Sequence, residues 1–242
     1  SISKIQGTDT DGPAQVGSWG RPAGKTIGFP NSATIAQIWN TPLVVEIGHS
    51  HGKQALQNGY SGLYAPAANM HRSPFNGRNY EYYSEDSFLS GEMCGSAVQG
   101  IEEMGVYVYI KHFICNDGEA GIYRDAVYTW MTEQALREIY LRPFQMLIED
   151  YDATGLMSSY NRIGAVWAGG SEALLTGVLR DEWGFHGAVI TDAVVSAWYM
   201  DGNLAIRTGG TKMLAFNITN EFYRDLNSVG TVTAMRNAGH GT

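Results

Sequence analysis

The chain of 242 residues carries a formal net charge of −8, and 44% of its residues are hydrophobic. The acidic balance argues against nucleic acid as a partner, and no apolar run reaches the roughly 18 residues of a membrane-spanning helix. Because the sequence shows no internal repeat and no interdomain linker, we expect residues 1–242 to form one α/β domain.

The predicted elements alternate between strands and helices. In chain order they are a strand tail at 1–6, a helix over 31–59 broken near Pro42, a strand at 63–67, a helix from the N-cap Ser84 to Met104, a strand at 106–110, a helix over 127–149 kinked at Pro143, a strand at 155–157, a helix over 171–183, a strand at 187–192, a helix over 194–208, a strand at 212–215 and a helix over 228–238. This order is typical of a (β/α)8 barrel, but only five or six strands are visible, so we expect an incomplete barrel.

Polar side chains that are capable of chemistry follow several of these strands. Lys111 and His112 end one strand, Tyr160 follows another, and Asp192 closes the apolar run Ala188-Val-Ile190. Because active sites of α/β barrels lie at the carboxyl ends of the strands, we expect these four side chains to share one pocket. Asp192 is equally well explained as the N-cap of the following helix.

A carboxylate beside cations and a tyrosine suits glycoside chemistry, in which it attacks or stabilises an oxocarbenium-like centre. Retaining hydrolysis also needs a second carboxyl group about 5 Å away. The sequence offers Glu119 and Glu221, and each is more simply explained as a surface charge. Lys111 at a strand end also fits a Schiff-base lysine, and His112 and Tyr160 fit hydrogen-bonded core residues.

The sequence predicts neither a metal site nor a cofactor site. No glycine-rich phosphate loop is present, and the histidines have no metal-ligand spacing. The two cysteines, Cys94 and Cys115, lie in separate segments, and we predict that both are free, buried thiols. The composition leaves the cellular compartment open.

Seven segments, in the same order, resemble the N-terminal barrel domain of family 3 glycoside hydrolases, the β-glucosidase-like group. They are Asp11–Pro13, Gly77–Asp86, Lys111–Phe113, Ala135–Phe144, Met157–Asn161, Leu179–Phe185 and Val189–Asp192. The resemblance implies a retaining β-glycosidase that acts on terminal β-linked glucose, or on a close relative such as xylose, with Asp192 as the nucleophile.

The same resemblance implies roles for seven further residues. Five of them would hold the sugar hydroxyls next to the cleaved bond: Asp11, Arg78, Lys111, His112 and Tyr160. Met157 would line that pocket, and Arg72 matches a loop arginine for which a structural role is as good an explanation as a substrate contact. Taken by themselves, Arg72 and Arg78 are better explained as loop-anchoring ion pairs.

The chain departs from the family pattern in three ways. Ala193 follows the nucleophile where many relatives have Trp, which puts aglycone preference in doubt. The acid/base Glu of β-glucosidase-like members belongs to a C-terminal α/β-sandwich domain, which this chain lacks, and the loop Ile114–Glu119 lacks the His-Asp pair of the N-acetylglucosaminidases. We therefore expect a fragment of a larger enzyme, slow or inactive alone. The alternative is a non-catalytic carbohydrate-binding or structural barrel fragment.

Overall fold

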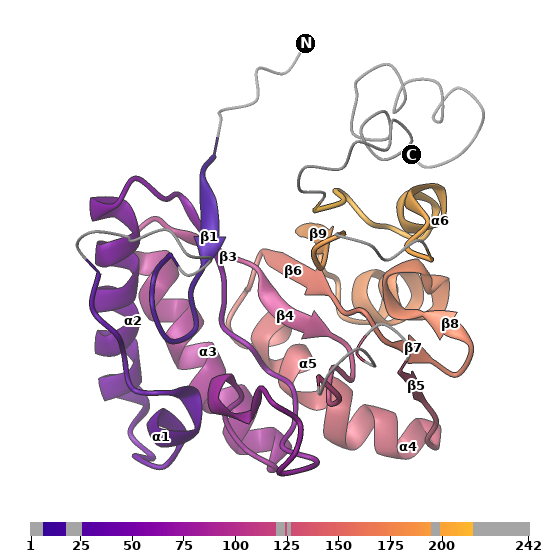
Figure 1. Cartoon of the computed structure of the whole chain (residues 1–242), viewed down its shortest axis with the longest axis horizontal. Helices are drawn as coiled ribbons and strands as arrows, with labels where there is room; N and C mark the ends of the chain where they lie inside the picture. Colours follow the sequence, from indigo (N-terminus) through magenta and orange to yellow (C-terminus); the bar gives the residue numbers. More distant parts are fainter. Residues whose placement is uncertain (1–6, 18–25, 120–123, 125–126, 195–198, 215–242) are drawn as a thin grey trace.

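The computed structural model describes residues 7–17, 26–119, 124, 127–194 and 199–214 (Figure 1). The predicted strand tail at 1–6, the predicted helix over 228–238 and the acid/base candidate Glu221 lie outside these ranges. Within them, no helix is both long enough and apolar enough to cross a membrane.

The core is built from short parallel strands whose order in space follows the sequence. One sheet has the order β1-β2-β3 and another the order β4-β6-β9, with every neighbouring pair parallel. A parallel bridge between Ala67 and Lys111 links the two sheets. The bounds are β1 Asp9–Asp11, β2 Gly62–Tyr64, β3 Tyr107–Val108, β4 Ile110–Phe113, β6 Gly155–Ser158 and β9 Ala188–Thr191. All carboxyl ends therefore face one edge.

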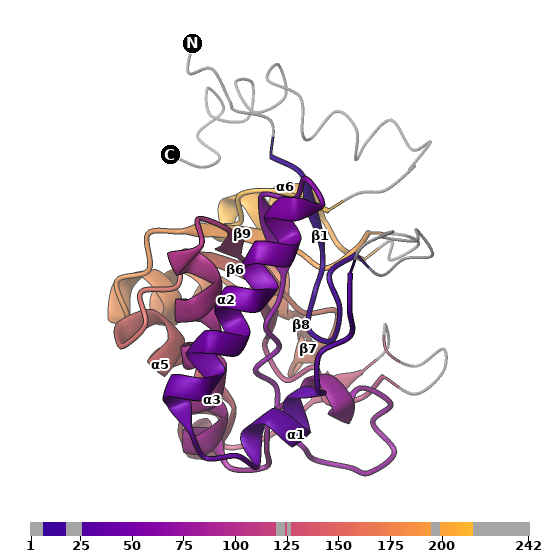
Figure 2. The same ribbon diagram turned by 90° about the vertical axis from the view of Figure 1, so that its left-hand side faces the viewer.

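Helices cover the outer side of these strands (Figures 1 and 2). Two long ones, α2 and α3, lie side by side, and their close approach requires glycine, since a Cβ at Gly100 would lie 2.2 Å from the carbonyl oxygen of Val45. The helical segments are α1 Ser32–Ala36, α2 Thr41–Gln57, η1 Asn79–Glu81, α3 Ser87–Glu103, α4 Glu133–Ala135, the π-helical η3 Leu136–Leu141, α5 Arg142–Glu149, η4 Ala168–Gly170, the π-helical η5 Ala173–Glu182 and α6 Gly202–Arg207.

One predicted helix break is confirmed, and two predicted helix starts were wrong. The break in the first helix is confirmed, because Asn40 caps a new helix whose first turn contains Pro42. Ser84 is not the cap of α3, since Asp86 accepts the hydrogen bond from the Leu89 amide. The helix predicted from residue 127 begins only at Glu133.

A small third sheet was not predicted. It contains β5 Tyr128–Thr129, β7 Arg162–Ile163 and β8 Val166–Trp167, with β5 and β7 parallel and β7 and β8 antiparallel. Strands of two residues carry too little periodicity to be recognised in a sequence.

Near the C-terminal end of the described chain, less regular structure forms than the sequence predicts. Within 194–208 the described helix is only α6, which Asp201 caps, and the predicted strand at 212–215 forms a single bridge from Lys212 to Ile190. Among the described strands no pairing joins β1 to the segment around Lys212, so the structure shows a mixed α/β domain and no closed barrel.

Candidate active site

A cluster of charged and polar side chains occupies the carboxyl-terminal edge of the parallel strands. Asp11 ends β1, Lys111 and His112 lie inside β4, and Asp192 directly follows β9. The Lys111 ammonium lies 3.4 Å from Oδ1 of Asp11, and Nε2 of His112 lies 3.6 Å from Oδ2 of Asp192. The sheet thus brings together side chains that are up to 181 positions apart in the chain. The strand-end pattern predicted this for Lys111, His112 and Asp192, whereas Asp11 was expected only from the resemblance.

Asp192 is held rigidly by its backbone. Its amide donates to the carbonyl oxygen of Ser158 at 2.9 Å, which continues the pairing of β6 with β9, and its Oδ1 accepts from the Ala193 amide at 2.7 Å. Among the described residues Oδ2 has no hydrogen-bond partner. Burial raises the pKa of Asp192 to about 6, although nearby arginines, Arg124 first, lower it.

His112 is neutral in this environment. Burial lowers its pKa well below the ordinary value, and the positive charges of Arg78, Lys111 and Arg124 act in the same direction. The His112 amide donates to Oδ1 of Asn69 at 2.8 Å, and the ring Nδ1 lies 3.3 Å from the same oxygen. Because that oxygen is an acceptor, we assign the ring proton to Nδ1, which leaves the lone pair of Nε2 facing Asp192.

Arg78 joins the cluster from the loop before η1. Its Nε pairs with Glu81, and its Nη1 donates to Oε1 of Glu119 at 2.8 Å. Burial alone would lower the pKa of Arg78, but the carboxylates of Glu81 and Glu119 raise it well above its ordinary value. Lys111 lies 3.7 Å from the other oxygen of Glu81, so two cations share one buried carboxylate.

Two important members of the cluster, Glu119 and Arg124, were missed or misread in the sequence. The Glu119 side chain is only 5% exposed, so its interpretation as a surface charge was wrong. Its Oε2 lies 2.9 Å from Nε of Arg124, whose Nη2 lies 3.6 Å from Oδ2 of Asp192. The guanidinium of Arg124 also stacks over the ring of Tyr160, with 4.2 Å from Cζ to the ring centroid. Their position in the loop that follows Lys111–Phe113 was the feature of the sequence that could have placed both residues at the site.

Glu119 is poorly suited to be the second carboxyl group of a retaining glycosidase. A general acid must carry a proton, whereas the two oxygens of Glu119 face the guanidinium groups of Arg78 and Arg124. Asn116 also donates to Oε1 of Glu119, at 2.5 Å. The cluster therefore contains a candidate nucleophile, Asp192, while Glu119, like Glu81, faces two cations and serves as an anchor for them.

The other predicted site residues, Tyr160, Met157 and Arg72, make no ion pair with Asp192 among the described contacts. The buried Tyr160 donates its hydroxyl to the carbonyl oxygen of Ala193, and the buried Met157 packs with Tyr64, Ile190 and Leu214. Arg72 lies over the ring of Tyr140 and beside Asp117, and no described contact links it to Asp192. Burial raises the pKa of Asp117 to about 7, and Arg72 partly offsets this, which favours the loop-anchoring interpretation of Arg72.

The surroundings of Lys111 argue against Schiff-base chemistry. A Schiff base forms from the neutral amine, but the buried Lys111 lies within 3.4 and 3.7 Å of two carboxylates that pair with its ammonium form. Among the described residues, no group of three or more His, Cys, Asp or Glu side chains is arranged to hold a metal ion. Cys94 and Cys115 are free and buried, as predicted.

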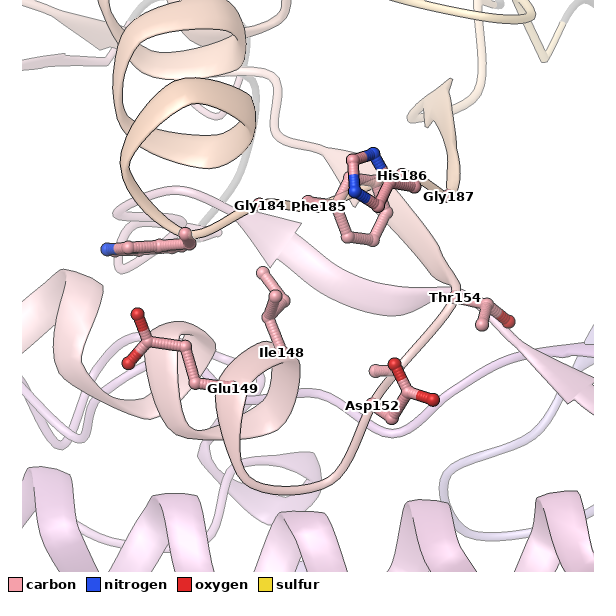
Figure 3. A pocket seen from close by; sticks show the side chains of 10 residues that line it. Ile148, Glu149, Asp152, Thr154, Gly184, Phe185, His186 and Gly187 are labelled. Carbon is pink, nitrogen blue, oxygen red and sulfur yellow. The ribbon is translucent and has the colours of Figure 1, made fainter.

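A separate hollow of about 540 Å³ lies at the opposite, amino-terminal edge of the strands. Figure 3 shows Ile148 and Glu149 from the end of α5 on one side, and Phe185 and His186 from the loop before β9 on the other. Glu149 and His186 are exposed, and no described ion pair joins them. The hollow therefore lacks the converging buried charges of the cluster at the other edge.

The chain is similar in sequence to known proteins over most of its length. Residues 14–208 match the sequence pattern of the glycosyl hydrolase family 3 N terminal domain. A β-glucosidase from Rhizobium radiobacter is 39% identical over 185 residues, which cover 76% of this chain and 22% of that protein. β-Glucosidase A from Butyrivibrio fibrisolvens is 38% identical over 182 residues, 75% of this chain and 22% of that protein.

Solved structures are similar over almost the whole chain. β-Glucosidase 3B from Thermotoga neapolitana in complex with glucose superposes with a TM-score of 0.84 at 35% identity, covering 97% of this chain and 33% of that one. The β-glucosidase from Kluyveromyces marxianus in complex with glucose gives a TM-score of 0.82 at 27% identity, covering 97% of this chain and 27% of that one. The chain thus spans between about a fifth and a third of the length of these relatives.

Proposed function

The chain belongs to glycosyl hydrolase family 3, and on this premise we propose that its charged cluster is the glucose-binding half of a retaining β-glucosidase site. The observation that carries the proposal is the state of Asp192: one carboxylate oxygen is fixed by a backbone amide, and the other lacks a hydrogen bond within the described residues and faces His112 and Arg124. A nucleophile needs such an oxygen, both fixed in place and available for attack.

In the proposed reaction, Oδ2 of Asp192 attacks the anomeric carbon of a terminal β-D-glucosyl residue. The bond to the aglycone oxygen breaks, that oxygen takes a proton from a general acid, and a glucosyl ester of Asp192 forms. Water then attacks the same carbon and gives a proton to the base, while the bond from that carbon to Oδ2 of Asp192 breaks. Glucose is released with its configuration retained, and the Asp192 carboxylate is regenerated. The positive charges around Asp192 keep its carboxylate ionised while the oxocarbenium-like centre forms.

The surrounding residues are proposed to bind the hydroxyl groups of that sugar. Asp11 and Lys111 form one acceptor–donor pair, Arg78 supplies further donors, and neutral His112 offers an acceptor nitrogen. Tyr160 and Met157 shape the wall rather than binding through free polar atoms, because the Tyr160 hydroxyl is bound to the Ala193 carbonyl and Met157 has an apolar packing environment.

We propose that the general acid/base is a Glu from a C-terminal α/β-sandwich domain. The support is that the carboxyl groups of Asp11, Glu81 and Glu119 in the described cluster each face a cation, and that the relatives are three to five times longer than the matched region. In the same way we propose that the parallel strands belong to a (β/α)8 barrel, since their order and common direction are those of consecutive barrel strands.

The proposal is tested by trapping the ester. The 242-residue chain is incubated with 2,4-dinitrophenyl 2-deoxy-2-fluoro-β-D-glucoside, whose leaving group departs with little help from an acid. The expected result is a single covalent adduct on the peptide that contains Asp192, and none in the Asp192→Asn variant. Glucose binding without any adduct after long incubation would favour the alternative, a carbohydrate-binding fragment without turnover.

A further inference from the structure

The two oxygens of the Asp192 carboxylate have different hydrogen-bonding environments. Oδ1 accepts from the Ala193 amide at 2.7 Å, whereas Oδ2 has a guanidinium nitrogen of Arg124 at 3.6 Å, which is beyond hydrogen-bond distance. An arginine this close to a buried carboxylate normally approaches to about 2.8 Å, because a charge-assisted hydrogen bond is more favourable than an ion pair without one. The longer distance indicates that other contacts restrain the Arg124 guanidinium.

Two contacts hold the Arg124 guanidinium in place. Its Nε lies 2.9 Å from Oε2 of Glu119 in an ion pair that lacks hydrogen-bond geometry, and its guanidinium lies over the Tyr160 ring with Cζ 4.2 Å from the centroid. Glu119 is itself fixed, since Arg78 and Asn116 both donate to its other oxygen and its amide donates to the carbonyl oxygen of Asn76 at 3.2 Å. The carboxylate of Glu119 is therefore a rigid anchor.

We propose that Glu119 is a positioning residue that holds Arg124 away from the attacking oxygen of Asp192. Arg124 then supplies positive charge, which favours the ionised nucleophile, without occupying Oδ2 with a hydrogen bond. The effect on chemistry rests on the proposed glycosidase function, but the effect on the Asp192 carboxylate does not, so the two can be tested separately.

The substitution Glu119→Gln releases this restraint. The amide keeps the size of the side chain but not its charge, so Arg124 is free to close on Asp192. The groups that face Asp192 are Arg124, Arg78 from the loop before η1, Lys111 and His112 from β4, and the Ala193 amide. Of these, Arg124 is the one whose position depends on Glu119 and that also contacts Oδ2.

The first experiment measures the ionisation of Asp192 directly. The chain is labelled with ¹³Cγ-aspartate, the Asp192 signal is assigned from its loss in Asp192→Asn, and its pKa is followed by NMR. In Glu119→Gln we expect the pKa of Asp192 to fall by about one unit or more, because Arg124 moves into hydrogen-bond distance. Glu182→Gln is the matched control, since Glu182 pairs with Arg137 on the surface.

The decisive comparison repeats the Glu119→Gln change in an Arg124→Met background. If Arg124 transmits the effect, Glu119→Gln then shifts the pKa of Asp192 by less than half as much. An equal shift in both backgrounds would overturn the proposal, because it would show that Glu119 acts through its own charge or through Arg78 and not through Arg124.

The second experiment measures the rate of covalent labelling by the fluoroglucoside in the same variants. We expect Glu119→Gln to slow labelling about tenfold, and Arg124→Met to cost less in the Glu119→Gln background than in the wild type. Additive losses would overturn the positioning role. Failure of the wild-type chain to be labelled would count against the proposed function instead, while the NMR comparison would still decide the role of Glu119.

Discussion

The two edges of the parallel strands in this domain differ in a way that shows how the site can be recognised. At the carboxyl-terminal edge, buried acids and bases converge within 4 Å of one another. At the amino-terminal edge there is an open volume of about 540 Å³, but its polar side chains Glu149 and His186 are exposed and make no ion pair within the described residues. The hollow lies at the amino-terminal edge and the charged cluster at the carboxyl-terminal edge, and the proposed function rests on the charged cluster.

The largest expected effect concerns the proposed nucleophile. Asp192→Asn should lower the rate of release of 2,4-dinitrophenol from the corresponding β-glucoside by a factor of about 10³ or more, because the amide cannot form the covalent ester. The rate is followed by absorbance, with far-UV circular dichroism as the check that the variant folds. A rate within tenfold of the wild type would remove Asp192 from the mechanism.

The same substitution should stabilise the fold at neutral pH. Burial raises the pKa of Asp192 from its ordinary value near 3.8 to about 6, so the folded state binds this proton more tightly than the unfolded chain does. The carboxylate therefore costs stability as the pH rises through the window from about 4 to 6, and above it the cost is about 3 kcal/mol at most.

Urea unfolding at pH 7 and pH 3.5 tests this stability prediction. Asp192→Asn is expected to raise the free energy of unfolding at pH 7 and to change it little at pH 3.5, where Asp192 is protonated in the folded wild type and mostly protonated in the unfolded chain. An identical effect at both pH values would mean that ionisation of Asp192 carries no such cost.

At the amino-terminal edge we expect a substitution to lower the stability of the domain without changing the labelling reaction. A Cβ at Gly187 would lie 2.0 Å from the carbonyl oxygen of Thr154, so Gly187→Ala should destabilise the domain by about 1–3 kcal/mol. The pH profile of labelling should not move. Gly28→Ala is the control, because nothing lies within 4 Å of the added Cβ.

The smallest effect is expected inside the hollow itself. Glu149→Gln and His186→Ala remove its exposed polar groups, and surface changes of this kind usually alter stability by no more than about 0.5 kcal/mol. Labelling rates should stay within twofold of the wild type. A tenfold loss in either variant would show that the two edges are coupled, and the contrast between them would no longer hold.

The predicted site was partly accessible from the sequence because parallel strands bring their carboxyl ends to one edge. The apolar run before Asp192 and the polar pair Lys111-His112 followed from that rule, and so did their closeness in space. Glu119 did not, because a glutamate in a long loop is ordinarily exposed, and only the folded loop shows that two arginines surround it. For Arg72 the resemblance allowed a structural role or a substrate contact, and only the structure shows that it packs on Tyr140.

The sequence by itself determined the alternation of strands and helices, the family resemblance and the position of the acid that closes β9, since these depend on local periodicity and on the order of motifs. Only the tertiary structure decided where helices begin, that Glu119 is buried, and that Oδ2 of Asp192 lies 3.6 Å from both His112 and Arg124. The physical reason is that burial and electrostatics arise between side chains distant in sequence, so they do not exist until the strands pair.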